Sequence, residues 1–433
     1  MGLLKKINTY KTTIFVISLL FIAKFLGFIK NIFLAKYYGT TIIADSYQMA
    51  ISITTIVVGI VLYSYQAFTK GYYISEKKNE TNEYTSTFLN FILIILFFIF
   101  MIMIFFKKVI INIFAPGFND EQIKYTSSFL LPITIGTMCL AISNILAEYL
   151  RCKNSYVISQ MAYLTINVIE IMTIFLAFYI DYNWLSYGYL LANLTYFVIL
   201  LFICAKKNLK YYLILKQEEF KLFSKILIPI FLSSIITDIN SMIDKIFASH
   251  SGTGIVSTLS YATNIKTVTL IIASGFLTVL FPKISKKSVE SDFKEFKRIV
   301  KKSFFIIIGI YLPITILFIV FSRDIVKCVY YRGAFDTDAL SRTALCLKMY
   351  IIGIMGISIR DLYVKALYCL EEGSFVTIIS VISVGANILL NIFLYTKIGY
   401  VGLPLATSLA VWIINPLLIY YYRKCINKRI QNG

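Results

Sequence analysis

Long apolar stretches recur along nearly the whole chain, separated by short polar segments. Each holds about 20 residues, enough for a helix to cross the hydrocarbon core of a bilayer. The stretches are too long and too uniformly apolar for strands of a membrane barrel. We therefore predict an all-α polytopic membrane protein with about 12 transmembrane helices. The expected spans are 12–35, 41–69, 84–106, 126–150, 156–180, 184–204, 221–249, 255–281, 303–321, 342–370, 374–395 and 400–422.

Composition supports this class of protein. Of 433 residues, 58% are hydrophobic and only 15% are charged, which excludes an ordinary soluble domain. The net charge of +20 reflects basic cytoplasmic loops rather than a nucleic-acid partner. The seven cysteines include no CxxC pair, so neither a zinc site nor a disulfide framework is indicated.

Basic residues concentrate in alternate loops and thereby predict the orientation of the chain. The rich set comprises Lys5, Lys6, Lys11, Lys70, Lys77, Lys78, Arg151, Lys153, Lys206, Lys207, Lys210, Lys216, the run 283–302, Arg423, Lys424, Lys428 and Arg429. The poor set comprises Lys107, Lys108, Lys124, Arg323, Lys327, Arg332 and Lys397. Because cytoplasmic loops are the basic ones, both termini are expected in the cytoplasm. The first apolar run has no small-residue cleavage site, so we interpret it as an uncleaved helix.

Two cytoplasmic segments, 206–221 and 283–302, are long enough to hold structure of their own. In the second segment, apolar residues recur at helical spacing among lysines. We expect both to form amphipathic helices on the anionic inner leaflet, with a solvated basic loop as the alternative.

The chain also repeats itself weakly. Ile29–Phe33 resembles Ile243–Phe247, 214 residues later, and Gly117–Asp120 resembles Gly333–Asp336. An even-numbered unit repeats in the same orientation, so we expect two six-helix lobes related by a pseudo-twofold axis along the membrane normal. The predicted divisions are an N-terminal lobe 1–205, a cytoplasmic linker 206–220 and a C-terminal lobe 221–433.

Charged residues interrupt the first two spans. Lys24 and Lys30 lie in the first span and Asp45 lies near the start of the second. A charge near the bilayer centre costs at least roughly 2.5–3.5 kcal/mol, so the two lysines are predicted to line a central cationic cavity. The alternative is that they snorkel to an interface, as expected for Lys36.

The second half also carries charges in its spans. Asp238 lies deep in the seventh span and has no opposite charge close in sequence, whereas Asp244 could pair with a lysine of the first helix. In the tenth span, Asp361 and Lys365 are four residues apart and are predicted to neutralise each other, which leaves Arg360 as the freer cation.

Polar side chains of the last two spans could complete a cation site around Asp238. Asn387 and Asn391 share one helical face, and Thr407 lies on the next helix. Oxygen ligands of this kind suit a sodium ion. The alternative is that these side chains form interhelical hydrogen bonds.

Enzymatic motifs are missing from the sequence. It contains no GxxxxGK[ST] loop, no HExxH and no GxSxG. The short loops leave no room for a catalytic domain. We therefore expect neither an enzyme nor a protein driven directly by ATP.

Taken in order, several segments resemble the lipid II flippase family of the multidrug/oligosaccharidyl-lipid/polysaccharide exporter superfamily. They are LGFIKNIFLAKYYG with Ala44-Asp45, Ala115–Phe118, Ile243–Ala248, Tyr261-Ala262, Leu280–Pro282, Tyr331–Phe335, Asn387–Asn391, Gly402-Leu403 and Ala406–Ser408. The resemblance implies an inverted V of two lobes that works by alternating access. It also implies that Lys24, Lys30 and Asp45 fall on substrate-site positions of the family.

The same resemblance implies a sodium site, which falls on Asp238, Asn387, Asn391, Leu403 (through its carbonyl) and Thr407. Sodium would be a coupling or regulatory ion, and no other cofactor is expected.

The sequence thus predicts a monomeric flippase of the bacterial cytoplasmic membrane. It would move a polyprenyl-pyrophosphate-linked saccharide of the lipid II kind from the inner to the outer leaflet, with Lys24, Lys30, Lys266 and Arg360 attracting the phosphates. The chain departs from the family at Asn31, where an acidic residue is expected, and it lacks an arginine in the second span. Two alternatives therefore stay open: another lipid-linked polysaccharide, as carried by O-antigen and capsule flippases, and a cation-coupled small-molecule exporter.

Overall fold

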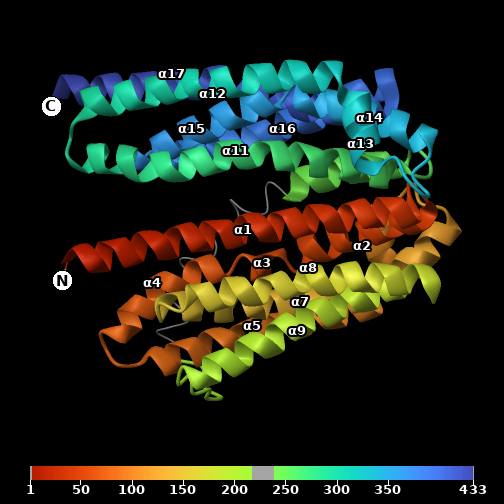
Figure 1. Cartoon of the computed structure of the whole chain (residues 1–433), viewed down its shortest axis with the longest axis horizontal. Coiled ribbons are helices and arrows are strands. Elements are labelled where there is room, and N and C mark those ends of the chain that lie inside the picture. Colours follow the sequence, from red (N-terminus) through yellow and green to blue (C-terminus); the bar gives the residue numbers. More distant parts are fainter. Residues whose placement is uncertain (1, 217–237, 433) are drawn as a thin grey trace. The chain divides into compact units, whose positions relative to one another are not determined.

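The computed structural model describes residues 2–216 and 238–432, and these residues form helices and connecting turns without any strand (Figure 1). The chain divides into two compact units, Met1–Met242 and Ile243–Gly433, which are described one at a time.

The first unit contains nine labelled helices. They are α1 (Gly2–Tyr38), α2 (Ile42–Val57), α3 (Gly59–Leu62), α4 (Tyr65–Glu76), α5 (Thr81–Phe105), α6 (Lys107–Phe114), α7 (Asp120–Cys152), α8 (Tyr156–Tyr179) and α9 (Trp184–Lys206). Within this unit α7 packs against α2, α5 and α9, and α8 packs against α1 and α9. The α8–α9 contact depends on Gly188, because a Cβ atom there would lie 1.9 Å from Oγ1 of Thr173.

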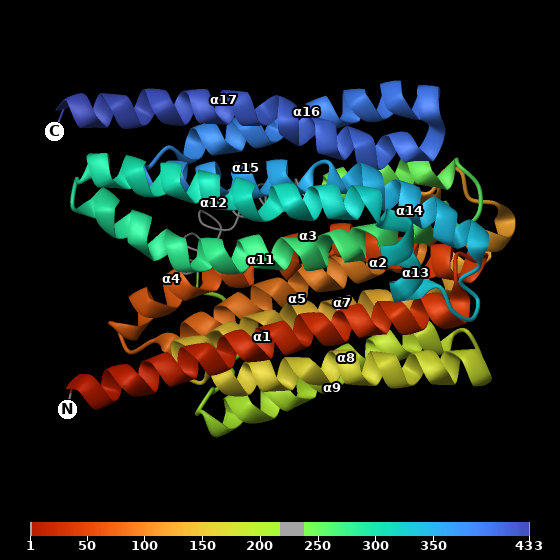
Figure 2. The ribbon, with the colours of Figure 1, turned by 45° about the horizontal axis from the view of Figure 1, so that its top comes forward.

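A helical segment, 238–249, crosses the boundary between the units. The remaining elements are α11 (Ile255–Val289), α12 (Phe293–Val320), α13 (Ser322–Tyr330), α14 (Thr337–Ile351), α15 (Ile354–Cys369), α16 (Gly373–Ile398), the 3-10 turn η1 (Gly399–Val401) and α17 (Gly402–Asn432). Helix α17 packs against α15 and α16, and α11 packs against α14 and α15. The α16–α17 hairpin is visible in Figure 2.

The break between α14 and α15 leaves backbone carbonyls without their helical partners, and α17 supplies donors for them. Ser408 Oγ donates to the carbonyl of Met349 at 2.6 Å, and Trp412 Nε1 donates to that of Ile352 at 2.9 Å. Gly353 permits this approach, because a Cβ atom there would lie 2.7 Å from Ser408 Oγ. These hydrogen bonds stabilise the break within the apolar part of the unit, where an unsatisfied carbonyl would be costly.

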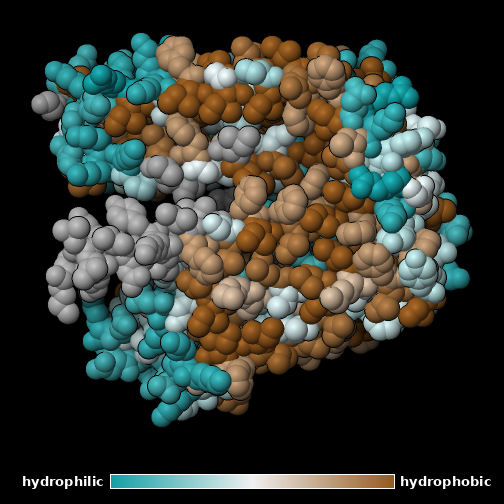
Figure 3. All heavy atoms as spheres, viewed as in Figure 1, coloured by the Kyte–Doolittle hydropathy of each residue, from teal (hydrophilic) through white to brown (hydrophobic). Residues whose placement is uncertain are grey.

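Nine stretches of the described residues are long and apolar enough to cross a membrane, or ten if the bent pair Ile42–Val57 and Gly59–Thr69 forms one span. The stretch Gly373–Gln431 counts once but holds both α16 and α17. Hydrophobic side chains cover the middle of the helices in each unit, and hydrophilic ones gather at the ends (Figure 3). The chain is a multi-pass membrane protein. The predicted span 221–249 lies mostly outside the described residues, so the number twelve stays a prediction.

Helix boundaries repeat at the offset that the sequence echoes suggest. Helix α7 begins at Asp120 and α14 at Thr337, an offset of 217 residues, and α8 and α16 begin at Tyr156 and Gly373, again 217 apart. One echo consists of helix caps: Asn119 Oδ1 accepts from the backbone N–H of Gln122, and Asp336 Oδ1 accepts from that of Ala339, both at 2.8 Å. The repeated motif is therefore a repeated helix start.

The basic run 283–302 is not a separate surface helix. Helix α11 continues to Val289, Ser291 turns the chain with φ of 56°, and α12 begins at Phe293. Phe296 and Val300, which suggested an amphipathic helix, are buried within the unit. The prediction was wrong because their periodicity records packing between helices rather than contact with lipid.

The linker also differs from the prediction. Residues 207–216 contain no helix, and Asn90 Nδ2 on α5 donates to the carbonyls of Tyr212 and Ile214, both at 2.9 Å. This part of the linker therefore belongs to the first unit, and the boundary after Met242 falls further along the chain than the predicted linker 206–220. The rest of the linker lies outside the described residues.

Candidate substrate and ion sites

A buried ion pair joins α1 to α8 in the first unit. Lys30 Nζ lies 2.8 Å from Glu170 Oε2, and the side chains are 21% and 4% exposed. A charge so deeply buried is stable only when it is paired, because desolvation costs several kcal/mol per ion. Sequence reasoning missed Glu170, although an acidic residue within an apolar span was a signal.

The helices around this pair approach each other closely. Asn167 Nδ2 on α8 donates to the carbonyl of Ala23 at 3.2 Å, and a Cβ atom at Gly27 would lie 3.2 Å from Asn167 Oδ1. Asn31 turns back to its own helix and donates to the carbonyl of Gly27 at 3.0 Å. Small and amide side chains thus hold α1 against α8 and fix the position of Lys30.

The other two predicted residues of this unit differ in exposure. Lys24 is exposed and makes no ion pair within the described part of the chain. Asp45 is fully buried in the first turn of α2. An acidic side chain there is stabilised by the positive end of the helix. Of the three, Lys24 is thus the one that is open to a ligand without rearrangement.

In the second unit, four polar side chains converge from three helices. Asp244 accepts hydrogen bonds from Asn391 Nδ2 (2.7 Å, Oδ1) and from Thr407 Oγ1 (3.0 Å, Oδ2). Asn391 Nδ2 also donates to Asn387 Oδ1 at 3.0 Å, and Asn387 Nδ2 donates to Thr407 Oγ1 at 3.3 Å. The carbonyl oxygen of Leu403 lies 3.3 Å from Thr407 Oγ1. We call these five residues the Asp244 cluster.

The Asp244 cluster is enclosed, with Asp244 5%, Asn387 1% and Asn391 0% exposed. One buried atom in it, Asn391 Oδ1, has no hydrogen-bond partner among the described residues. Its potential ligands are all oxygens and carry one negative charge, a donor set that suits an alkali cation.

The structure brings Asn387, Asn391, Leu403 and Thr407 together as predicted, but with Asp244 in place of Asp238. The carboxylate of Asp238 accepts a hydrogen bond from the Tyr63 hydroxyl at 2.6 Å. The two aspartates are six positions apart on one helical segment, a rise of about 9 Å, so they lie at different heights along it. The hydrogen bonds of Asn391 and Thr407 therefore reach Asp244 and not Asp238, and the binding of sodium by either aspartate stays a prediction.

The predicted cations of the second unit have neighbours that the sequence did not identify. Lys266 Nζ lies 4.2 Å from the ring centroid of Tyr350, a cation–π contact between α11 and α14. Arg360 lies 3.3 Å from Asp361, its immediate neighbour, and both are exposed by more than a third. The predicted Asp361–Lys365 pair is not among the ion pairs of the described residues, so Arg360 is not the freer cation.

The two clusters occupy equivalent places in the internal repeat. Lys30 and Asp244 are 214 residues apart, as in the echo around them, and Glu170 and Asn387 are 217 apart, the offset of α8 and α16. In the first unit an ammonium group neutralises the acid. In the second unit the acid accepts hydrogen bonds from an amide and a hydroxyl, and Lys245 and Lys266 attract it electrostatically.

Comparison with known proteins gives consistent matches over most of the chain. The family model of the lipid II flippase MurJ matches residues 34–433. A probable lipid II flippase MurJ of Rickettsia prowazekii is 24% identical over 98% of this chain and 86% of its own length. One from Buchnera aphidicola subsp. Schizaphis graminum has the same identity and coverage.

Two solved structures share the fold. A lipid II flippase MurJ in an inward closed conformation has a TM-score of 0.82, at 23% identity, and the match covers 97% of this chain and 90% of that one. An inward-facing multidrug resistance MATE family transporter of the MOP superfamily has a TM-score of 0.83, at 12% identity, over 95% and 96%. The all-helical fold is thus that of the MOP superfamily. By the match of its sequence over residues 34–433, the chain belongs to the lipid II flippase MurJ family.

Proposed function

We propose that this chain moves lipid II, a lipid-linked saccharide that carries a pyrophosphate, from the inner to the outer leaflet of the bacterial cytoplasmic membrane. The observation that carries the proposal is the pair of lysines on α1, placed within an apolar span of a protein of this family. Cations in the membrane are costly and mark substrate pathways. Both termini would lie in the cytoplasm, and the working unit would be a monomer.

The two lysines would act in sequence. Exposed Lys24 attracts the pyrophosphate electrostatically, while Lys30 is held by Glu170. When the anionic head enters, Lys30 donates to a phosphate oxygen while it stays beside Glu170, so that neither member of the ion pair is left unpaired. Between transport cycles Glu170 holds the Lys30 ammonium group in position. The membrane potential biases the movement of the charged head by roughly 2.3 kcal/mol per charge per 100 mV.

Complementation tests this function. A bacterium depleted of its own lipid II flippase would express the wild type, Lys24→Ala, or Lys36→Ala as a control on the same helix. We expect rescue by the wild type and Lys36→Ala and failure of Lys24→Ala, with lipid II accumulating in the inner leaflet. If the inserted wild type does not rescue growth, the substrate is a different lipid-linked glycan and the proposal fails.

We also propose that a sodium ion binds the Asp244 cluster as a coupling ion. Two facts support it: the all-oxygen donor set with one negative charge, and the buried, unpartnered Asn391 Oδ1. A rotation of the Asn391 amide by a half turn would point Oδ1 at the oxygens of Asp244 and Asn387. In that orientation the oxygens repel one another when the site is empty, and a cation between them makes the arrangement favourable. The orientation of the Asn391 amide would therefore change when the ion binds. When bound, the ion supplies the positive charge that Lys30 supplies at the equivalent place of the first unit.

Thermal stability in sodium chloride, compared with choline chloride, tests the ion site. Sodium at 100 times its dissociation constant should stabilise the wild type by about 2.7 kcal/mol. Asp244→Asn should abolish this effect, whereas Asp238→Asn should retain it. Equal stabilisation of the wild type and Asp244→Asn would refute the site.

A further inference from the structure

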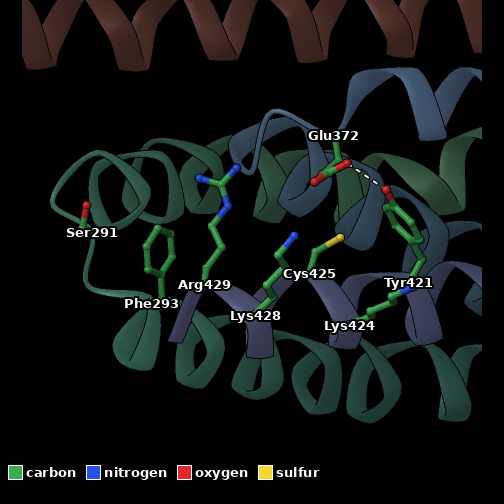
Figure 4. Close-up of a pocket in the computed structure, with 8 residues that line it drawn as sticks. All are labelled: Ser291, Phe293, Glu372, Tyr421, Lys424, Cys425, Lys428 and Arg429. Atoms are coloured by element: carbon green, nitrogen blue, oxygen red, sulfur yellow. Dashed lines mark hydrogen bonds between the residues drawn. The ribbon is translucent and has the colours of Figure 1, made fainter. Parts of the chain in front are cut away.

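A pocket of about 590 Å³ opens at one end of the second unit (Figure 4). It is formed where the α11–α12 turn, the α15–α16 turn and the last part of α17 meet. Its lining residues are Ser291, Phe293, Glu372, Tyr421, Lys424, Cys425, Lys428 and Arg429. We call it the α17 pocket.

One continuous face of α17 supplies most of the lining. The lining residues of this helix occupy its positions i, i+3, i+4, i+7 and i+8, so their side chains project from the same side; they are Tyr421, Lys424, Cys425, Lys428 and Arg429. The face carries three cations. The acidic lining residue, Glu372, accepts a hydrogen bond from the Tyr421 hydroxyl at Oε2, at 2.8 Å. The pocket therefore has a net positive charge.

Tyr421 and Arg429 are fixed in the wall of the pocket by contacts with neighbouring residues, whereas its two lysines form no ion pair among the described residues. The ring of Tyr421 stacks on Phe375 with centroids 3.6 Å apart. Arg429 donates to the carbonyl of Leu370 at 2.7 Å, and its guanidinium carbon lies 5.7 Å from the Phe293 ring centroid. These lysines, Lys424 and Lys428, are exposed. Figure 4 shows Lys428 rising from α17 between Arg429 and Cys425, whereas Lys424 lies along α17 below Tyr421.

The position along α17 places the pocket at the membrane surface. Helix α17 begins at Gly402, and about 20 helical residues cross the hydrocarbon core, so Tyr421 falls at the far boundary. Tyrosine is enriched at that depth, and basic residues beyond it reach the phosphate layer. Lys424, Lys428 and Arg429 are thus level with lipid phosphates.

The same helices continue into the membrane as a lipid-exposed apolar surface. One to two turns from the pocket, Ile378 on α16 is 58% exposed, and Leu417 and Tyr420 on α17 are 48% and 70% exposed. A ligand whose phosphate sat in the pocket could lay its acyl chains along this surface. The pairing of a cationic pocket with an adjacent apolar track fits a phospholipid better than free phosphate.

We propose that the α17 pocket binds the phosphate of an anionic phospholipid, with Lys424 and Lys428 as the adaptable ligands and Arg429 as the fixed one. The site is separate from the Asp244 cluster, because its α17 residues lie at least 14 positions beyond Thr407, and the proposal does not depend on the identity of the transported saccharide. Its anchored lipid would tie the α11–α12 turn, the α15–α16 turn and α17 together at the membrane surface.

Native mass spectrometry of the purified full-length protein tests the proposal, with phosphatidylglycerol as the probe and phosphatidylcholine as the neutral comparison. We expect one tightly bound phosphatidylglycerol in the wild type. Lys424→Gln with Lys428→Gln should weaken it about tenfold or more. The control is Lys301→Gln with Lys302→Gln, which removes the same charge from exposed lysines of α12 outside the pocket and should have no effect.

Thiol labelling provides a second measurement that does not depend on the lysine variants. Cys425 lines the pocket, whereas Cys328 on α13 is exposed elsewhere. Phosphatidylglycerol in nanodiscs should slow maleimide labelling of Cys425 relative to phosphatidylcholine and leave Cys328 unchanged. Loss of binding in both lysine pairs alike would overturn the site, as would equal labelling of Cys425 in the two lipids. Protection of Cys425 by millimolar inorganic phosphate as strong as that by phosphatidylglycerol would overturn the choice of a lipid.

Discussion

The Lys30–Glu170 ion pair permits a double-mutant cycle that separates its structural role from its transport role. Lys30→Met would leave Glu170, which is 4% exposed, as an unpaired buried charge, and removing one partner of such a pair costs about 3–5 kcal/mol. Glu170→Leu should cost less, because Lys30 is 21% exposed and its flexible stem can carry the ammonium toward water. The double variant replaces both charges with apolar side chains of similar size and should regain most of the stability.

The chain contains a convenient reporter of unfolding. Cys204 is fully buried in the first unit and Cys346 in the second. Two backgrounds that each retain only one of these cysteines would therefore report the two units separately when a thiol-reactive dye is present during heating. For a unit of this size, 3–5 kcal/mol corresponds to a fall in melting temperature of about 6–20 °C. The shift should appear at Cys204 in Lys30→Met and shrink in the double variant.

The ranking of the variants by transport activity should differ from their ranking by stability. Complementation should fail for Lys30→Met and also for the refolded double variant, because both lack the ammonium group proposed to receive phosphate. If the two single substitutions add without coupling, the ion pair is not an energetic unit and the reasoning is wrong. If the double variant rescues growth, Lys30 serves only the fold.

Two further predictions concern a close helix contact and two helix caps. Gly188→Ala should destabilise the first unit by about 1–3 kcal/mol, because its methyl group would overlap Thr173. Gly59→Ala is the control, since nothing lies within 4 Å of its added Cβ atom, and the melting temperature reported by Cys204 should fall only in Gly188→Ala. Asn119→Ala and Asp336→Ala should each cost about 1 kcal/mol through loss of equivalent helix caps, and each shift should appear first at the cysteine of its own unit; an unchanged melting temperature in both would contradict the capping argument.

Much of this protein is determined by the sequence alone, because the physical constraint acts locally. A bilayer requires each spanning segment to satisfy its own backbone, so apolar length predicts helices such as α5 and α12 directly. The repeat was visible as similar short motifs, Gly117–Asp120 and Gly333–Asp336, and the structure shows that each motif contains the cap of a helix, Asn119 or Asp336. The family resemblance likewise rests on ordered local segments, and the match to the family model confirms it.

Only the tertiary structure shows which side chains of different helices bind each other. Nothing near Lys30 in the sequence indicates that Glu170, 140 residues away, neutralises it. The choice between Asp238 and Asp244 likewise depends on which turn of one helix faces Asn391 and Thr407. Similar polar side chains can occur on successive turns of one helix. The sequence therefore limits the ligands of a site to one or two turns of a helix without identifying the residue. The rotation and height of each helix against its neighbours, set by packing, select the side chain.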